Sequence, residues 1–290
     1  MDHTIRPAVQ GDLESITAFT RDTFSWGDYV PERFEEWLAD DATQVLVAAN
    51  ADDHPVALAV CTLLSPIEAW LQAARVEPAS RRRGLASRLN QDLTTWAKSR
   101  GARVARLAIE DWNEGAISQT AALGYRPTCH WVYAKRAVGA ASPVPEGNGG
   151  QRVATAEKVM QAPSGESGPA YLSWTSGPLA APARNLFGRD WRWRRLEIDD
   201  LEHAGRNGML FEARAGWAMA IPRADELQVA WMETSEEDAY ALTRSLVDLA
   251  VDLGVDSIEF MIPKVDWLVG AVRRAGCDIE PLTVYSLPLA

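Results

Sequence analysis

The most informative stretch of the chain is Ala74-Arg75-Val76-Glu77-Pro78-Ala79-Ser80-Arg81-Arg82-Arg83-Gly84-Leu85-Ala86-Ser87. The apolar run at residues 69–76 predicts a β-strand, and apolar positions at helical spacing predict a long helix over residues 80–100. Gly101 suits the end of that helix. The stretch therefore joins a strand to a helix through a loop that holds three arginines and a glycine.

This loop has the chemistry of a diphosphate site. A helix start leaves backbone N–H groups without partners and carries a partial positive charge. Gly84 lets a backbone approach a ligand, Ala86 keeps the first turn open, and guanidinium groups suit phosphate oxygens. The alternative is a solvated basic helix start with no ligand. The sequence context favours the diphosphate site.

The spacing resembles a known family. The pattern Arg81-x-x-Gly84-x-Ala86, preceded by Val76-x-Pro78, is similar to the pyrophosphate motif of the GNAT acetyltransferases. Residues 113–117, leading to Leu123-Gly124-Tyr125, resemble the family's Asn-x-x-Ala helix. The opening at residues 5–8, with Asp12 as a helix cap, also fits. The resemblance covers residues 4–136 well and residues 152–290 in element order only.

The resemblance implies an α/β fold in which a central mixed, mostly antiparallel twisted sheet is flanked by helices. Strands at residues 69–76 and 104–110 would splay apart, and the pantetheine arm of acetyl-CoA would enter between them. The Val76 N–H would hold the oxyanion while an amine attacks directly, without an acyl-enzyme. The implied cofactor-binding residues are Arg75, Val76, Arg81, Arg82, Arg83, Gly84, Leu85, Ala86, Ser87, Asn113 and Ala116.

Proton transfer needs an acid and a base near the thioester. Glu68 and Glu110 are the candidate bases, as carboxylates expected at the mouth between the two strands. Both could equally be solvated acids at strand ends. Thr120 occupies the position where family members often carry a tyrosine acid, so water, Tyr125 or Tyr133 would have to protonate the thiolate.

The acceptor pocket is the least constrained part of the site. In the resembled family the segment between the first two helices borders the acceptor, and here it contains Trp26, Asp28 and Tyr29. Aromatic rings beside an acid suit an amine, and Trp70 would share the strand face of Glu68. An ordinary packed loop is the alternative. Residues 191–195 alternate tryptophan and arginine, which predicts a strand with both tryptophans inward.

The second half of the chain repeats the element order of the first. In the first half we expect helices from residue 13, at 31–38 and at 115–123, with further strands at 43–49, 56–64 and 130–134. In the second half we expect strands at 210–213, 217–221, 227–232, 257–262 and 283–287, with helices at 235–253 and 265–275. The helix-ending glycines Gly101 and Gly254 lie 153 positions apart, and Gly124 and Gly276 lie 152 apart. This predicts a duplicated domain.

The second copy lacks the basic loop. At the 153-residue offset Arg81 aligns with Thr234 and Gly84 with Glu237, and residues 233–238 contain four acids and no base. Acids at a helix start would repel a diphosphate. We therefore expect a domain with the acetyl-CoA site at residues 1–137, a Gly/Pro-rich linker at 138–151, and a degenerate domain at 152–290.

Composition limits the remaining possibilities. The 290 residues are 47% hydrophobic with a net charge of −11, which disfavours nucleic-acid binding. No apolar run approaches the twenty residues of a membrane span, and the N-terminus lacks the layout of a signal peptide, so we expect a cytoplasmic protein that does not contact membranes. Scattered histidines and three separated cysteines predict no metal site and reduced thiols. We expect a monomer or homodimer.

These features predict an N-acetyltransferase that acts on a small-molecule amine or amino acid. A non-catalytic acyl-CoA-binding or regulatory protein, and a protein or peptide N-acetyltransferase, are the alternatives.

Overall fold

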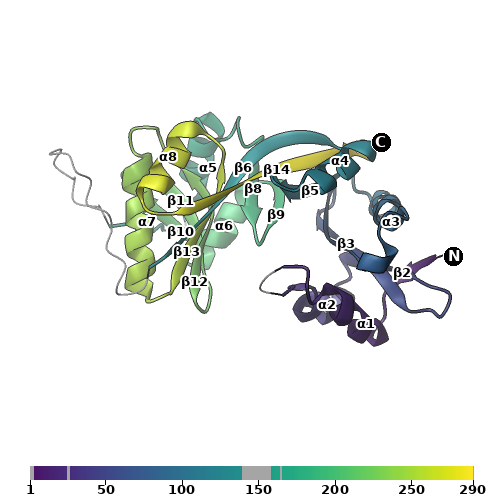
Figure 1. Cartoon of the computed structure of the whole chain (residues 1–290). Helices are drawn as coiled ribbons and strands as arrows, with labels where there is room; N and C mark the ends of the chain where they lie inside the picture. The colour runs from purple at the N-terminus through teal and green to yellow at the C-terminus, as the bar shows by residue number, and fades with distance from the viewer. Residues whose placement is uncertain (1–2, 25–26, 139–157, 164, 290) are drawn as a thin grey trace. The chain divides into compact units, whose positions relative to one another are not determined.

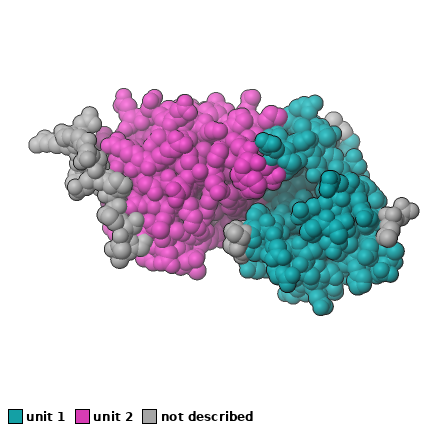
Figure 2. Space-filling model, viewed as in Figure 1, with its two compact units in different colours: residues 1–108, 114–126, 285–290 teal, residues 109–113, 127–284 magenta. Residues whose placement is uncertain are grey.

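The structure is a computed structural model that describes residues 3–24, 27–138, 158–163 and 165–289. The chain forms two compact units (Figure 2). Unit 1 comprises Met1–Ala108, Glu114–Arg126 and Tyr285–Ala290, and unit 2 comprises Ile109–Asn113 and Pro127–Val284.

Unit 1 is built on a sheet with the strand order β1-β2-β3-β4-β5 (Figure 1). Neighbouring strands are antiparallel except β4 and β5, which are parallel. The strands are β1 (Thr4–Pro7), β2 (Thr43–Ala49), β3 (Pro55–Ser65), β4 (Glu68–Val76) and β5 (Val104–Glu110). The helical segments are η1 (Gln10–Asp12), α1 (Leu13–Thr20), α2 (Val30–Ala39), η2 (Pro78–Ser80), α3 (Leu85–Ser99) and α4 (Glu114–Ala122).

Helices cover both faces of this sheet. In Figure 1, α1 and α2 lie on one side of β2 and β3, and α3 lies on the other. The core under α1 and α2 includes Ile16, Phe34, Trp37 and Ala73. Leu85, Leu89 and Leu93 of the apolar stripe of α3 are buried as the spacing predicts. Ala97, and not the expected Trp96, completes the buried face, since Trp96 is only half-buried.

In unit 2 the main strands follow the order β14-β6-β13-β12-β11-β10-β7, with both parallel and antiparallel neighbours. Its strands are β6 (Arg126–Ala137), β7 (Met160–Gln161), β10 (Leu210–Ala213), β11 (Gly216–Pro222), β12 (Glu226–Glu233), β13 (Ser257–Pro263) and β14 (Asp278–Pro288). A separate hairpin consists of β8 (Leu186–Arg189) and β9 (Arg192–Arg195). The helices are α5 (Ser167–Ser176), α6 (Ile198–Arg206), α7 (Ala239–Leu253) and α8 (Asp266–Arg274).

The two units share a local arrangement. In unit 1, β3 pairs antiparallel with β4, which pairs in parallel with β5. In unit 2, β11 pairs antiparallel with β12, which pairs in parallel with β13. A long helix, α3 or α7, connects the parallel strands in each case. This correspondence agrees with the repeated element order of the sequence.

The structure moves several predicted boundaries. The helix expected from residue 80 begins at Leu85, because the arginine-rich loop adopts other conformations. Asp12 stands at the start of α1 but makes no capping bond, since its carboxylate binds Arg6 and the Val9 N–H instead. Helices α5 and α6 were not expected.

The predicted domain boundary is also displaced. Residues 131–137 of β6 pair with β13, so they belong to unit 2, whereas Tyr285–Ala290 belongs to unit 1. Apart from Val138, the predicted linker at 138–151 lies outside the described residues. In the described parts of the chain, no helix is both long and apolar enough to cross a lipid bilayer.

Of the two tryptophans in residues 191–195, only one is buried on a strand as predicted. Trp193 is fully buried on β9, but Trp191 precedes the strand in a left-handed turn and is 36% exposed.

Candidate functional site

The loop between β4 and α3 has an unusual backbone. Arg82 has a φ of 62° and Gly84 a φ of 74°, both in the left-handed region. A Cβ added to Gly84 would meet no atom within 4 Å, so space does not require glycine there. The left-handed φ independently favours glycine at this position. Close approach of a ligand at Gly84 stays a prediction.

A continuous run of free N–H groups follows from this backbone. The first bond of α3 joins the Arg88 N–H to the Gly84 oxygen at 3.0 Å. Among the described residues, the six N–H groups of residues 82–87 have no acceptor. The side chains of Arg81, Arg82 and Arg83 are exposed around them. Such a run at the N-terminus of a 15-residue helix is suited to a diphosphate.

Strand β4 carries a β-bulge that the sequence analysis missed. The register with β3 shifts between Leu58 and Val60, so Ala73 and Ala74 together oppose one residue. Ala73 has a φ of 56°, which is uncommon for a residue other than glycine. Alanine's small side chain gives no sequence signal for this conformation.

The parallel strands of unit 1 separate soon after they begin. The ladder between β4 and β5 covers three residue pairs, and in the described part of the chain it ends at Trp70 and Arg106. Residues 71–76 of β4 therefore have an edge without strand pairing on the β5 side. We call this unpaired edge the β4 gap.

The Val76 N–H faces the β4 gap. The Glu77 N–H donates to the Val56 oxygen at 2.8 Å, so Val76 and Ala57 form a non-hydrogen-bonded pair. In such a pair the N–H and C=O of each residue point away from the partner strand. The carbonyl of Val76 accepts a bond from Arg81 Nε at 3.3 Å.

Arg75 does not have the predicted position in the site. Its Nε and Nη2 donate to Asp28 at 2.6 and 3.3 Å, and its Nη1 donates to the Ala74 oxygen at 3.3 Å. The guanidinium carbon also lies 5.2 Å from the Phe24 ring centre and 5.6 Å from that of Tyr29. By the alternation of the ladder, the main chain of Arg75 faces β3. Its main chain is thus directed to β3, and its side chain is mainly engaged with Asp28 and Ala74.

Asp28 is likewise committed within the protein. Its side chain is fully buried, and it accepts the Val30 N–H at 3.1 Å in addition to the bonds from Arg75. The carboxylate that we expected to attract an acceptor amine is thus neutralised by a guanidinium. Tyr29 packs edge-on against Trp37, with ring centres 6.1 Å apart.

The other predicted acceptor residues differ in accessibility. Trp70 is 2% exposed within the sheet. Trp26 lies outside the described residues.

Glu68 lies at the wrong end of β4 for its predicted role. It opposes Val104 where the two strands are paired, is 4% exposed, and forms an ion pair with Arg106. Eight residues separate it from Val76, which is roughly 26 Å along a strand. Glu68 therefore cannot take a proton directly from an amine held at Val76.

The remaining predicted residues are divided between the units. Ala116, on α4, belongs to unit 1, whereas Glu110 and Asn113 belong to the short segment of unit 2. The Asn113 N–H donates to the Glu110 oxygen at 2.9 Å in a turn after β5. The roles of these three residues stay predictions.

The alternative acids named from the sequence, Tyr125 and Tyr133, are both engaged in hydrogen bonds within the protein. Thr120 is 6% exposed. Tyr125 is 1% exposed and donates to Asn90 at 3.3 Å, and burial raises its pKa. Tyr133 donates to Glu259, and burial followed by this bond raises its pKa as well.

The loop before α7 differs from the loop before α3 in charge and in bonding. Ser235 Oγ accepts the Asp238 N–H at 3.2 Å, so part of this helix start is capped by its own loop. The preceding residue on β12, Glu233, is 3% exposed, and its Oε2 has no hydrogen-bond partner among the described residues. Burial raises the pKa of Glu233 to about 8.

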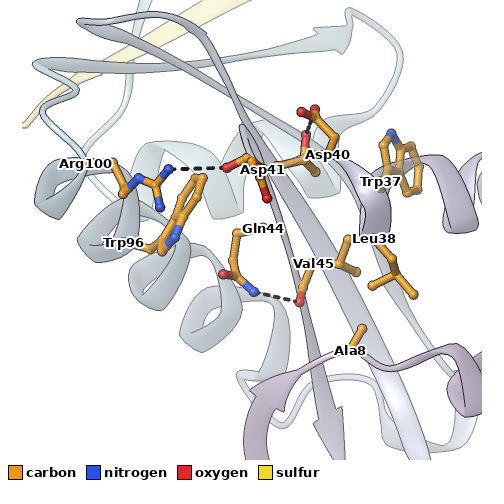
Figure 3. Close-up of a pocket in the computed structure, with 10 residues that line it drawn as sticks. Ala8, Trp37, Leu38, Asp40, Asp41, Gln44, Val45, Trp96 and Arg100 are labelled. Atoms are coloured by element: carbon orange, nitrogen blue, oxygen red, sulfur yellow. Dashed lines mark hydrogen bonds between the residues drawn. The ribbon is translucent and has the colours of Figure 1, made fainter.

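A cavity of about 280 Å³ lies elsewhere in unit 1 (Figure 3). It is bordered by the ends of α2 and α3 and the start of β2, and Arg100 lies beside the Trp96 ring and donates to the Asp41 oxygen. No predicted site residue lines it. The opposite end of α3, about 20 Å away along a helix of this length, carries the free N–H groups.

Comparison with solved structures identifies the fold. A GCN5-related N-acetyltransferase from Sphaerobacter thermophilus matches with a TM-score of 0.71 and 15% identity, over 99% of this chain and 96% of its own. A tandem GNAT protein from the clavulanic acid biosynthesis pathway matches with a TM-score of 0.61 and 12% identity, over 100% and 99%. The chain therefore has the GNAT fold in a tandem arrangement.

Sequence comparison finds similarity to one family in the first half of the chain. Residues 13–125, which are somewhat under half of the chain, match the acetyltransferase (GNAT) family. A histidine N-acetyltransferase from Oreochromis niloticus is 28% identical over 106 residues, which are 36% of this chain. The match spans about a third of that relative, 32% of its length.

Proposed function

We propose that the chain is an acetyl-CoA-dependent N-acetyltransferase with its donor site in unit 1. The run of six free N–H groups at residues 82–87, surrounded by exposed arginines, carries this proposal. A diphosphate would supply acceptors to these donors and negative charge to the start of α3. The GNAT domain at residues 13–125 includes the whole loop.

The β4 gap would hold the pantetheine arm, because an extended amide-bearing chain can pair with an unpaired strand edge. Acetyl-CoA supplies the activated thioester. The Val76 N–H would donate to the thioester oxygen as negative charge develops there, and such a donor lowers a barrier by about 3 kcal/mol. Arg81 would hold the Val76 carbonyl through the bond described above.

Direct transfer to the amine agrees with the state of the cysteines. Cys61, Cys129 and Cys277 are buried thiols that form no disulfide among the described residues. Burial raises the pKa of Cys61 to about 12 and that of Cys277 to about 11, so neither thiol is a nucleophile at neutral pH. The attacking amine nitrogen would form the amide bond as the thiolate leaves.

A primary amine of a small molecule or amino acid is the acceptor class that we propose. The relative from Oreochromis niloticus is named for acetylation of an amino acid, histidine, which supports this class. Glu110 remains our candidate for the base, acting directly or through water.

We also propose that unit 2 is a degenerate copy without a donor site. The loop at residues 233–238 carries four acids, and residues 230–233 of β12, next to the corresponding strand gap, are all buried. In unit 1 the end of β4 is partly exposed. An acidic, filled site is unsuited to a diphosphate-bearing ligand.

Titration calorimetry with acetyl-CoA tests the donor site. We expect one molecule to bind per chain, and the Arg81→Glu/Gly84→Glu variant to bind about 100-fold more weakly, or ~3 kcal/mol. Glu237→Gly changes the aligned, exposed position in unit 2 and should bind as the wild type does. Absence of binding to the wild type would refute the proposal.

A non-catalytic acyl-CoA-binding role is the second candidate. The burial of Thr120 and the hydrogen bonds that occupy Tyr125 and Tyr133 favour it. Turnover measured on a panel of amines, amino acids and peptides separates the two roles. Acetyl-CoA binding without acetylation of any acceptor would support the second.

A further inference from the structure

Arg75 connects two parts of unit 1 that lie far apart in the sequence. Through Nε and Nη2 it holds Asp28, 47 residues earlier, and through Nη1 it holds the oxygen of Ala74 in the β-bulge. All three guanidinium nitrogens are therefore bonded. The pair is largely shielded from solvent, with Arg75 17% exposed and Asp28 fully buried.

Asp28 in turn fixes the start of α2. Its Oδ1 accepts the N–H of Val30, the first residue of the helix, and the next turn closes with the Arg33 N–H on the Tyr29 oxygen at 3.2 Å. Val30 is fully buried in the core under α1 and α2. A displacement of Asp28 would thus loosen the first turn of α2.

The connection ends beside the β4 gap. Arg75 is adjacent to Val76, whose N–H faces that gap, and the bulge residue Ala73 packs in the same core as Val30. Three of the five guanidinium N–H groups of Arg75 are engaged within the protein. Its side chain joins the Ala74 oxygen in the bulge to the carboxylate of Asp28.

We propose that Arg75 is a positioning residue that holds residues 28–30 against the end of β4 and couples them to occupancy of the β4 gap. The coupling to acetyl-CoA rests on the proposed function, whereas the positioning rests on the contacts alone. A ligand that pairs with β4 would restrain the bulge, and the Arg75–Asp28 bonds would pass this restraint to the first turn of α2.

Hydrogen exchange at the Val30 and Arg33 amides is the direct test. Arg75→Lys keeps the charge but loses the forked pair of bonds, and we expect exchange at both amides to become about tenfold faster without ligand. Arg6→Lys is the matched control. Arg6 lies on the edge strand β1 and donates a similar forked pair of bonds to Asp12, at 2.8 and 3.0 Å. That variant should leave both amides within about twofold of the wild type.

Acetyl-CoA adds the second comparison. In the wild type it should slow exchange at Val30 and Arg33, whereas Arg75→Lys should bind it within about threefold of the wild-type Kd and show no slowing. With an active acceptor, Arg75→Lys should raise the KM for the amine and leave kcat nearly unchanged.

The outcomes separate the two proposals. Equal exchange in Arg75→Lys and the wild type, or an equal effect of Arg6→Lys on the same amides, would overturn the positioning role. Slowing by acetyl-CoA that persists in Arg75→Lys would overturn the coupling. Failure of the wild type to bind acetyl-CoA would refute the donor site and the coupling with it, while exchange without ligand still decides the positioning.

Discussion

At the scale of single residues, the left-handed backbone at Gly84 has a measurable cost. Gly84→Ala should lower the free energy of unfolding by about 1 kcal/mol, because alanine is strained at a φ of 74° although the space is open. Gly270→Ala is the matched control, since that glycine lies within α8 and also has open space. It should raise the free energy of unfolding by about 0.5–1 kcal/mol.

Urea unfolding of the two variants checks this prediction. If alanine lowers the free energy of unfolding at Gly84 and raises it at Gly270, the backbone conformation is the cause. A Gly84→Ala variant as stable as the wild type would contradict the left-handed conformation of the loop.

The buried carboxyl group of Glu233 should give the stability of the protein an unusual dependence on pH. Burial raises its folded pKa to about 8 from an ordinary 4.5, so between these values the folded protein keeps a proton that the unfolded chain releases. This contribution to stability is complete below about pH 4.5 and is lost as the pH rises to about 8, by up to ~1.4 kcal/mol per pH unit. Glu233→Gln cannot ionise and should not share the loss.

The measurement is the difference in unfolding free energy between Glu233→Gln and the wild type from pH 5 to pH 8. We expect the free energy of unfolding of the variant to rise steadily relative to that of the wild type as the pH increases across this range. Glu237→Gln, an exposed acid in the adjoining loop, should show a constant difference. A constant difference for Glu233→Gln as well would contradict the raised pKa.

The side-chain pairings that could not be predicted from the sequence have a common physical reason. Gly84 and the arginines can be recognised by residue type alone, so the sequence could indicate the position of this loop. The pairing of Arg75 with Asp28 joins positions 47 apart, and the ion pair of Glu68 with Arg106 joins positions 38 apart. Such partners depend on how the strands and helices pack. Nothing in the residue types of one segment specifies them.

At the scale of the element, the arginine loop should make donor binding sensitive to salt. Raising NaCl from about 0.05 to about 0.5 M shortens the screening length from roughly 14 to 4 Å. The exposed arginines should then attract a diphosphate less, and we expect the acetyl-CoA Kd of the wild type to rise about fivefold.

The Arg82→Gln/Arg83→Gln variant isolates this effect. It should bind more weakly at low salt and lose less than about twofold on the same change. Arg21→Gln/Arg33→Gln removes equal charge from the α1–α2 region and should retain the wild-type salt response. A wild-type Kd that is independent of salt would contradict a charge contribution from the loop.

Elements were predicted best where their periodicity is simple. The strand at residues 43–49 and that at 210–213 match β2 and β10. The bulge in β4 was missed because the small side chains of Ala73 and Ala74 are compatible with a regular strand. Strand β6 extends beyond the expected residues 130–134, and pairing with β13 accounts for its C-terminal extension to Ala137.

At the scale of the whole molecule, the composition of residues 138–151 predicts a domain boundary in this segment. The strand pairing gives a different division of the chain. A fragment of residues 1–137 would remove seven paired residues of β6 from β13. A fragment of residues 152–290 would take away Leu289, whose N–H donates to the Arg103 oxygen at 2.9 Å in unit 1. Each fragment therefore lacks part of a unit and carries an unpaired piece of the other.

We expect neither fragment alone to unfold cooperatively with the stability of the intact chain, because exposed strand edges and lost pairing weaken both. Co-expression of the two fragments should restore cooperative unfolding, since together they contain every strand. Thermal and urea unfolding of the separate and co-expressed fragments makes the comparison. Two independently stable fragments would show instead that the exchanged segments are dispensable, and that the domains end where the composition changes.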